Sequence, residues 1–281
     1  MARLARNVLT AASLAVLLTA CTQKGSGAAP PAAAEPTGQA AASVRPAQSW
    51  WRPHRGVTWQ WQLSGTVNTD VSAQVFDVDL FTTPASTVRT LHAKGTKVLC
   101  YLDAGSWEPG RPDSAAFPSR VRGRPLIGFE DERWFDVRRT DVLLPLIARR
   151  MDVCKAKGFD GVEPDNVDGF ANPTGFDLTA ADQLRFNRAL AQLAHARGLA
   201  VALKNDLGQI PTLAPVFDLA VNEQCFEFDE CDRLLPFIRA DKPVLHVEYA
   251  VPPSRFCAVT KRLGLSSLAK HESLDAYRRA C

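Results

Sequence analysis

The sequence predicts an α/β protein with one (β/α)8 barrel of the TIM-barrel type, placed after a signal peptide and a flexible linker. From Trp50 onward, short apolar runs alternate with helical patterns, as in barrels whose parallel strands are buried on both faces. Eight such runs occur in about 230 residues, which is near the lower end of the size range of this fold. Most of the runs also end in a carboxylate, as expected if the strands converge on one functional face.

The eight runs define the expected strands. They are residues 58–63, 73–80, 97–103, 159–165, 199–206, 217–223, 243–248 and 264–269. Helices are expected at residues 84–93, 141–157 and 179–197, because each is followed by a glycine and the last two begin after Thr140 and with Thr179-x-x-Asp182. A doubly wound open sheet is the alternative, but neither a GxGxxG fingerprint nor a Walker loop supports it.

The N-terminus predicts export. A short basic region precedes an apolar stretch from Val8 to Leu18, which is too short to span a bilayer. The stretch ends in Leu18-Thr19-Ala20-Cys21, which resembles a bacterial lipoprotein box, and a plain secretory signal is the alternative. We expect a lipoprotein signal peptide at 1–20, a flexible Ala/Pro-rich tether at 21–48 that starts at lipidated Cys21, and a catalytic domain at 49–281. The protein would be anchored on the outer side of the cell membrane or secreted.

The charge of the chain excludes one class of partner. It has 33 basic and 30 acidic residues, a net charge of +3, and no basic run. A nucleic-acid-binding surface needs clustered Lys and Arg. We therefore expect no nucleic-acid partner. We also expect the protein to be a monomer.

Apart from Cys21, six cysteines remain in the chain. An even number in an exported protein predicts three disulfides, for which 15 connectivities are possible. We expect neighbours in the sequence to pair: Cys100 with Cys154, Cys225 with Cys231, and Cys257 with Cys281. No CxxC or HxxxH spacing accompanies them, so we expect no metal site.

Carboxylates follow six of the eight expected strands. They are Asp77 and Asp79, Asp103, Glu163 and Asp165, Asp206, Glu223, and Glu248. A single Asp at a strand end is most often a turn or cap residue, but in a barrel all of these side chains would converge on one pocket. Paired carboxylates suit the cleavage of glycosidic bonds, because one protonates the leaving oxygen and the other stabilises or attacks the anomeric carbon.

Aromatic residues near the same strand ends could stack on sugar rings, although core packing is the alternative for each. They are Trp59, Trp61, Tyr101, Trp107, Phe170 and Tyr249. His246 could donate to a substrate or be a satisfied interior histidine. Gly-x-Ser-x-Gly is absent, which removes the commonest serine-hydrolase signature.

Four motifs resemble glycoside hydrolase family 114, the endo-α-1,4-polygalactosaminidases and their relatives. They are Gly158-Phe-Asp-Gly-Val-Glu-Pro-Asp-Asn-Val-Asp168, Tyr101-Leu-Asp-Ala-Gly-Ser-Trp-Glu108, Leu203-Lys-Asn-Asp206 and Asn222-Glu-Gln-Cys225. The resemblance spans Trp59 to about Cys281. It implies a barrel that needs no cofactor and cleaves α-1,4-linked galactosamine polymers internally. It also implies catalytic acids at Asp165, the expected nucleophile, and Glu223, the expected acid/base, with the reverse assignment open.

We expect further residues to contact the polysaccharide. These are Trp59, Asp77, Asp103, Trp107, Glu163, Asn166, Asp206, Asn222, Glu248 and Tyr249. The long segment 104–139 should wall one end of the substrate groove, with Trp107 and Glu108 facing the sugar. Hydrolysis of another α-linked glycan, or glycan binding without cleavage, are the alternative functions.

Overall fold

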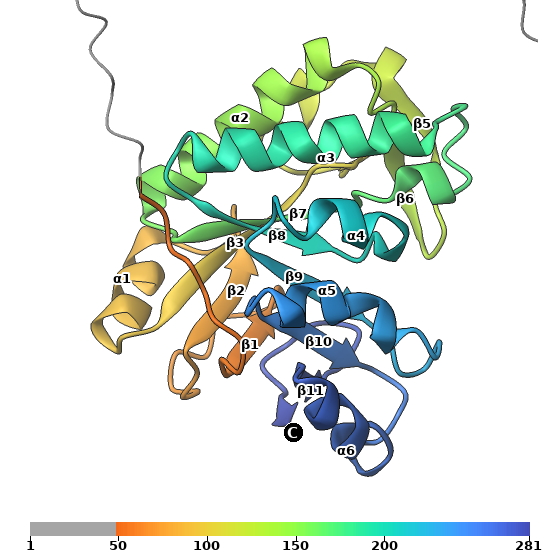
Figure 1. Ribbon diagram of the computed structural model, residues 1–281. Coiled ribbons are helices and arrows are strands. Elements are labelled where there is room, and N and C mark those ends of the chain that lie inside the picture. Colours follow the sequence, from red (N-terminus) through yellow and green to blue (C-terminus); the bar gives the residue numbers. More distant parts are fainter. Residues whose placement is uncertain (1–48) are drawn as a thin grey trace, which may run out of the picture. The chain divides into compact units, whose positions relative to one another are not determined.

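The computed structural model describes residues 49–281 (Figure 1). The expected signal peptide, the tether and Cys21 lie outside the described residues. These described residues form one compact unit. No helix in the described part of the chain is both long and apolar enough to cross a membrane.

Eight parallel strands form a curled sheet, and their order in space is their order in the sequence. The strands are β1 (Trp59–Gln62), β2 (Val75–Asp79), β3 (Lys97–Asp103), β7 (Gly161–Asp165), β8 (Ala200–Lys204), β9 (Leu219–Glu223), β10 (Val244–Glu248) and β11 (Ser266–Ala269). Each falls within one of the eight runs expected from the sequence. A short strand, β12 (Arg279–Ala280), pairs antiparallel with β11.

In residues 49–281, six α-helices lie outside this sheet (Figure 1). They are α1 (Ala85–Ala93), α2 (Thr140–Lys157), α3 (Ala180–His195), α4 (Ile210–Leu213), α5 (Leu235–Arg239) and α6 (Pro253–Leu263). Helix α3 begins with the expected capping box, in which Thr179 Oγ1 accepts from Asp182 N at 3.1 Å. Helix α2 ends at Gly158, whose φ of 95° suits a residue without Cβ. Its N-cap is Arg139, so the expected cap Thr140 is instead the first helical residue.

The alternation of strand and helix is less regular than the sequence predicts. No helix connects β1 to β2 in residues 63–74. The side chain of Gln62 organises this connection instead, because its amide donates to Ser64 O and Thr66 O and its oxygen accepts from Asn68 N. After β11 the chain runs to β12, again without a helix.

Segment 104–139 is folded, although the sequence predicts a long loop there. It contains the antiparallel strands β4 (Ser106–Trp107), β5 (Arg122–Leu126) and β6 (Phe129–Phe135), in the order β4-β6-β5. Two short 3-10 turns precede β5, at Ser114–Ala116 and Ser119–Val121. Further 3-10 turns lie at Gly169–Ala171, Leu207–Gln209 and Cys231–Leu234. The β5–β6 hairpin thus forms an added wall above the end of β3.

The curled sheet encloses an apolar interior, separate from the core between strands and helices. Its buried side chains come from seven of the eight parallel strands: Trp59, Trp61, Val75, Leu99, Ala202, Leu219, Val221, Leu245, Val247 and Leu268. In the described residues β1 and β11 share no backbone ladder. They are joined instead by the bond from Trp59 Nε1 to Ser266 O, 2.9 Å long, and by the buried Lys270 amine, which donates to Gln60 Oε1 and Asp275 O.

The three disulfides pair as expected. Cys100–Cys154 ties β3 to α2, Cys257–Cys281 ties α6 to the C-terminus, and Cys225–Cys231 closes the loop that follows β9. Chain-entropy arguments give the short third loop the smallest contribution to stability. Its position directly after Glu223 points instead to a local role in holding that loop.

Candidate active site

A cavity of about 530 Å³ opens at the carboxyl ends of the parallel strands. Strand ends, the β5–β6 hairpin and the C-terminal segment 272–274 all contribute to its walls. Its lining includes Trp61, Tyr101, Leu126, Ile127, Phe129, Glu132, Trp134, Asp165, Asn166, Asp168, Asn172, Lys204, Asn205, Glu223, Gln224, Tyr249, Glu272, Ser273 and Leu274. Four of the residues expected to catalyse cleavage or contact the polysaccharide therefore meet here: Asp165, Asn166, Glu223 and Tyr249. Two more of the aromatic candidates, Trp61 and Tyr101, also line the cavity.

A buried lysine joins the two expected catalytic acids. Lys204 Nζ lies 2.8 Å from Asp165 Oδ1 and 3.0 Å from Glu223 Oε2. The lysine side chain is only 5% exposed and its Nζ lies 5.1 Å from the centre of the Trp61 ring. Burial disfavours the ammonium form, but the charges of Asp165 and Glu223 outweigh it and raise the pKa of Lys204 well above its ordinary value. Lys204 is thus held as a cation between two carboxylates.

The environment of Asp165 favours its ionised form. Besides Lys204, it accepts hydrogen bonds from Tyr101 OH at 3.0 Å and from Asn166 N at 2.7 Å. Burial alone would raise the pKa of Asp165, but the Lys204 charge and these hydrogen bonds lower it overall. A carboxylate held anionic in this way can act as a nucleophile.

Glu223 is positioned by a different set of donors. Its carboxylate accepts from Tyr249 OH at 2.5 Å and from Asn205 Nδ2 at 3.2 Å, in addition to Lys204. Burial, followed by the charge of Glu223, raises the pKa of Tyr249, which keeps this phenol a donor. Asn205 Oδ1 in turn accepts from Glu223 N and from the buried Asn222, which lies behind the cavity and does not line it.

The backbone bends sharply just after each of these strands. Asn166, Asn205 and Gln224 follow β7, β8 and β9, and their φ angles are 58°, 48° and 60°. Residues other than glycine rarely adopt positive φ, and such strain concentrates at functional sites. Close by, Ala104 N and Gly105 N both donate to Asp165 O, and a Cβ on Gly105 would lie 1.6 Å from Asn166 O. Glycine at 105 therefore lets the turn after β3 pass close to the turn after β7.

Three expected contact residues lie one layer beneath the cavity. Asp77 and Glu163 are fully buried inside the curled sheet, and Asp103 is 1% exposed. Asp103 accepts from Ser106 N at 2.6 Å and from Asn166 Nδ2 at 2.7 Å. Burial, followed by the charges of Glu108 and Asp165, raises the pKa of Asp103 well above its ordinary value. Asp103 therefore holds the Asn166 side chain beside Asp165 and does not itself line the cavity.

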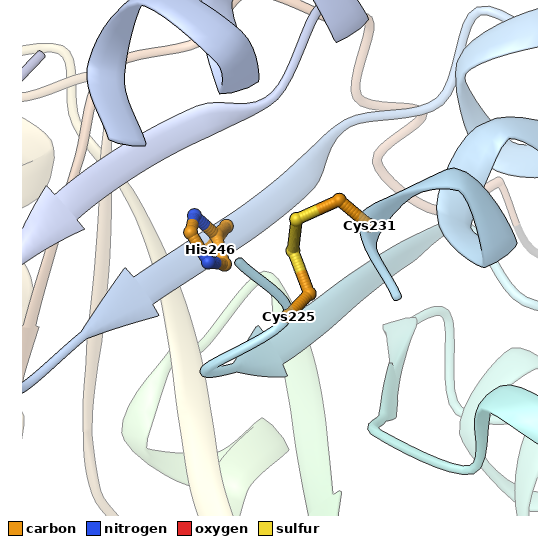
Figure 2. Close-up of side chains that lie close together, drawn as sticks. All are labelled: Cys225, Cys231 and His246. Carbon is orange, nitrogen blue, oxygen red and sulfur yellow. A yellow bond between two sulfur atoms is a disulfide. The ribbon is translucent and has the colours of Figure 1, made fainter. Parts of the chain in front are cut away.

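Glu248 also lies behind the cavity. It is fully buried and accepts from Phe226 N at 2.8 Å, while His246 Nε2 lies 2.8 Å from the same oxygen. Figure 2 shows His246 beside the Cys225–Cys231 disulfide. One of its ring nitrogens and the two sulfurs lie within 4.8 Å of one another. Because the sulfurs are bonded to each other, they are not available as thiolate ligands. Glu248 and the disulfide together fix the loop that follows Glu223.

Trp107 and Glu108 do not face the cavity, which corrects the expectation for segment 104–139. Trp107 Nε1 donates to Ser114 O at 3.0 Å, and the Arg122 guanidinium lies 4.0 Å from the centre of the Trp107 ring. Glu108 pairs with Arg111. The segment does line the cavity, but through residues at the tip and inner side of the hairpin: Leu126, Ile127, Phe129, Glu132 and Trp134.

Two further expected residues also lie away from the cavity. Trp59 is 1% exposed at the base of the interior, where its indole bonds to Ser266 O. Asp206 is 3% exposed and accepts from Asn187 Nδ2 at 2.9 Å. Burial, followed by the charge of Asp168, raises the pKa of Asp206 to about 8.

The sequence interpretation missed several cavity residues, of which Lys204 is the most important. Its signal was present, because Lys204 lies near the end of the expected strand 199–206 and within the motif Leu203-Lys-Asn-Asp206. Glu132 and Asp168 were also missed. Burial, followed by the charges of Glu108 and Asp165, raises the pKa of Glu132 to about 7, and burial followed by Asp165 raises that of Asp168.

The cavity lining carries a surplus of negative charge. Its five carboxyl groups are Glu132, Asp165, Asp168, Glu223 and Glu272, and its one amine is Lys204. In the described residues Glu132, Asp168 and Glu272 form no salt bridge. A cation bound among them would relieve the repulsion that Asp165 exerts on Glu132 and Asp168.

Comparison with known proteins agrees with this geometry. Residues 40–281 match the model of glycoside-hydrolase family GH114. The crystal structure of Ega3 from Aspergillus fumigatus, in complex with galactosamine, is 36% identical, with a TM-score of 0.79 over 83% of this chain and 98% of that one. The glycoside hydrolase domain of PelA from Pseudomonas aeruginosa has the same fold at 14% identity, with a TM-score of 0.64 over 80% of this chain and 99% of that domain. No curated protein sequence matches significantly. The chain belongs to glycoside-hydrolase family GH114 and is a glycoside hydrolase.

Proposed function

We propose that this enzyme is exported and cleaves α-1,4-linked galactosamine polysaccharides internally, with Asp165 as nucleophile and Glu223 as acid/base. The observation that carries the proposal is the arrangement of Asp165 and Glu223 on either side of Lys204, at the floor of an acidic cavity. The strand order and the Trp59–Ser266 link support a closed (β/α)8 barrel beneath it.

The spacing of the acids favours retention of configuration. The carboxylate oxygens of Asp165 and Glu223 that contact Lys204 lie 2.8 and 3.0 Å from its Nζ, so these two oxygens are at most about 5.8 Å apart. Retaining glycosidases hold their two carboxyl groups about 5–5.5 Å apart. Glu223 must take up a proton before the first step. In that step Asp165 attacks the anomeric carbon, the bond to the leaving oxygen breaks, and Glu223 gives that oxygen its proton. In the second step Glu223 takes a proton from water, whose oxygen displaces Asp165 from the sugar.

The lowered pKa of Asp165 supports this division of roles. A nucleophile must be ionised before the substrate binds, and Lys204, Tyr101 and Asn166 all stabilise the Asp165 anion. Lys204 also keeps the two carboxylates at a fixed separation while the charge on Asp165 is lost in forming the glycosyl ester.

The surplus of acids supports a cationic amino sugar as the substrate. Glu132, Asp168 and Glu272 lie in the cavity lining without a cationic partner, in addition to the catalytic pair. An ammonium group bound there would gain from the field of these carboxylates. The related Ega3 structure contains galactosamine, which agrees with this charge preference.

Reducing-end release from de-acetylated galactosaminogalactan tests the proposal, with the N-acetylated polymer and other α-linked glycans as a panel. Asp165→Asn and Glu223→Gln should each lower turnover by at least about a hundredfold, the effect of losing a positioned nucleophile or acid/base. Thermal melting should show that both variants remain folded, and NMR of the first product should show the α anomer.

Near-normal turnover of Asp165→Asn on a substrate that the wild type cleaves would reject this assignment of the catalytic pair. Cleavage of another α-linked glycan alone would reject the substrate. Glycan binding by the wild type without any cleavage would reject catalysis by this site.

A further inference from the structure

Two carboxyl groups meet inside the curled sheet, directly below the catalytic residues. Asp77 on β2 and Glu163 on β7 are both 0% exposed. Both side chains point inward, and β3 lies between the two strands: Asp77 lies opposite Leu99, and Glu163 lies opposite Tyr101, two residues farther along β3. Glu163 precedes Asp165 by two residues, so it lies on the same face of β7 and one step deeper.

The two groups lie within hydrogen-bonding reach of each other. As two carboxylates, however, all four of their oxygens would be buried without a donor. Two ionised carboxylates in contact, away from water, would be strongly destabilised. A proton on one of them removes the repulsion and provides the missing donor. The geometry therefore requires that the pair share at least one proton.

We propose that Asp77 and Glu163 are positioning residues of the glycosidase, a proton-sharing pair that carries at most one negative charge and holds the Lys204 ammonium over the Asp165–Glu223 pair. The proposal rests on Asp165 and Glu223 being the catalytic acids. Neither Asp77 nor Glu163 lines the cavity, so neither touches the substrate. Their influence would pass through Lys204, which lies close enough to interact with both.

The charged groups around the pair support this role. Lys204 is the cation that acts on it, Asp165 is the nearby anion, and Tyr101 lies between on β3. The interior side chains from β9, β10 and β11 are apolar: Leu219, Val221, Leu245, Val247 and Leu268. Burial raises the pKa of Asp77 to about 7 and that of Glu163 well above its ordinary value. At neutral pH the pair therefore keeps a proton, whereas two isolated carboxyls would have lost theirs.

This arrangement has a cost that can be measured. Both carboxyls have a higher pKa in the folded protein than the ordinary values of 3.8 and 4.5. The folded state therefore binds more protons than the unfolded state, and stability falls as pH rises from the ordinary carboxyl range through neutrality. An amide in place of one carboxyl supplies a permanent donor to the other and removes part of this cost. Asp77→Asn and Glu163→Gln should thus raise Tm at neutral pH.

The test compares the full chain with Asp77→Asn, Glu163→Gln and the double variant. We expect Tm at pH about 7.5 to rise by about 2–4 °C in each single variant, the size of one modest stabilising change in a domain of this length. The turnover number should fall about tenfold at unchanged KM, because the substitutions act through Lys204 on the transition state and leave the residues that line the cavity in place. The alkaline limb of the turnover–pH profile should move in all three variants, because the titrating pair has been altered.

Asp218→Asn is the matched control. Asp218, at 3% exposed, is almost as buried as the pair, but its carboxylate is hydrogen-bonded to Trp50 Nε1, His195 Nε2 and Val201 N. Its loss should lower Tm and leave the pH profile of the folded enzyme unchanged. The same result in Asp77→Asn and Glu163→Gln would overturn the proposal and make the pair merely structural. Failure of the catalytic assignment would appear separately, as near-normal turnover of Asp165→Asn.

Discussion

Replacing Lys204 by methionine removes the one cation that both candidate catalytic carboxylates share. Its side chain is 5% exposed and its ammonium lies 2.8 and 3.0 Å from the two carboxylates, so water replaces it poorly. Loss of one preorganised charged donor typically raises the activation free energy by about 2.7–4 kcal/mol, which corresponds to a rate loss of about 10²–10³-fold. We therefore expect Lys204→Met to lower kcat/KM by about 10²–10³-fold.

The pH dependence identifies the cause of that loss. Lys204 is the main influence that holds the pKa of Asp165 below its ordinary value against the effect of burial. Without it, burial raises the pKa of Asp165, so ionisation needs a higher pH and the acid limb of kcat/KM moves upward. Activity should consequently fall more at pH about 5 than at pH about 7. Initial rates of reducing-end release measured across this range, together with Tm, provide the assay.

Lys242→Met is the control for this experiment, because Lys242 Nζ donates to Ala214 O and Phe217 O, away from the cavity. It should lower Tm without moving the acid limb. A Lys204→Met enzyme within about threefold of wild-type kcat/KM, with an unmoved acid limb, would refute the reasoning.

Two further predictions concern other parts of the chain. Trp107→Ala should lower Tm, measured by thermal melting, because Trp107 packs against Arg122 and donates to Ser114 O. It should leave the KM of the folded enzyme unchanged, because Trp107 does not line the cavity; a large rise in KM would contradict this. Cys21→Ala should release the protein from the membrane fraction on cell fractionation, whereas a wild-type protein found wholly in the medium would exclude the lipid anchor.

The strands could be predicted because parallel strands buried on both faces are continuous apolar runs. β3 matches its expected range at both ends, at Lys97 and Asp103, and the other seven lie within theirs. Helix ends were visible where local chemistry fixes them, as at Thr179 and Gly158. The absence of a helix between β1 and β2 could not be predicted, because the Gln62 side chain stabilises this connection by hydrogen bonds to its backbone. Such hydrogen bonds leave no periodic pattern in the sequence.

The antiparallel sheet β4-β6-β5 could not be predicted for a related reason. β6 contains Glu130-Asp131-Glu132-Arg133, which lacks the alternation of an ordinary half-buried strand, and its pairing with β5 shifts register twice. Its position depends on contacts far along the chain, such as Arg124 N with Thr174 O at 2.8 Å. The cavity wall formed by Ile127, Phe129 and Glu132 therefore became apparent only from the structure.

The periodicity of a strand does not show how deeply each acidic side chain is buried. A strand places alternate residues on the same face, so Glu163 and Asp165 both point into the interior. Glu163 is fully buried, whereas Asp165, two residues farther along the strand, lines the cavity. The sequence predicted that carboxylates lie at the strand ends, and of these Asp165 and Glu223 line the cavity. It could not distinguish those that contact the substrate from those, such as Asp103 and Glu248, that hold a neighbouring residue or loop in place.

Net charge was equally uninformative about the substrate, because it averages over the whole surface. The chain carries a formal +3, yet the cavity gathers five carboxyl groups around one amine. At physiological ionic strength, charges farther away than about 8 Å are largely screened, so a bound ligand responds to the cavity lining more than to distant lysines and arginines. The low-dielectric walls formed by Trp61, Leu126 and Phe129 strengthen that local field. A protein with a positive overall charge can therefore have an acidic cavity, and the carboxyl groups that make it acidic lie near strand ends, on one hairpin and in segment 272–274.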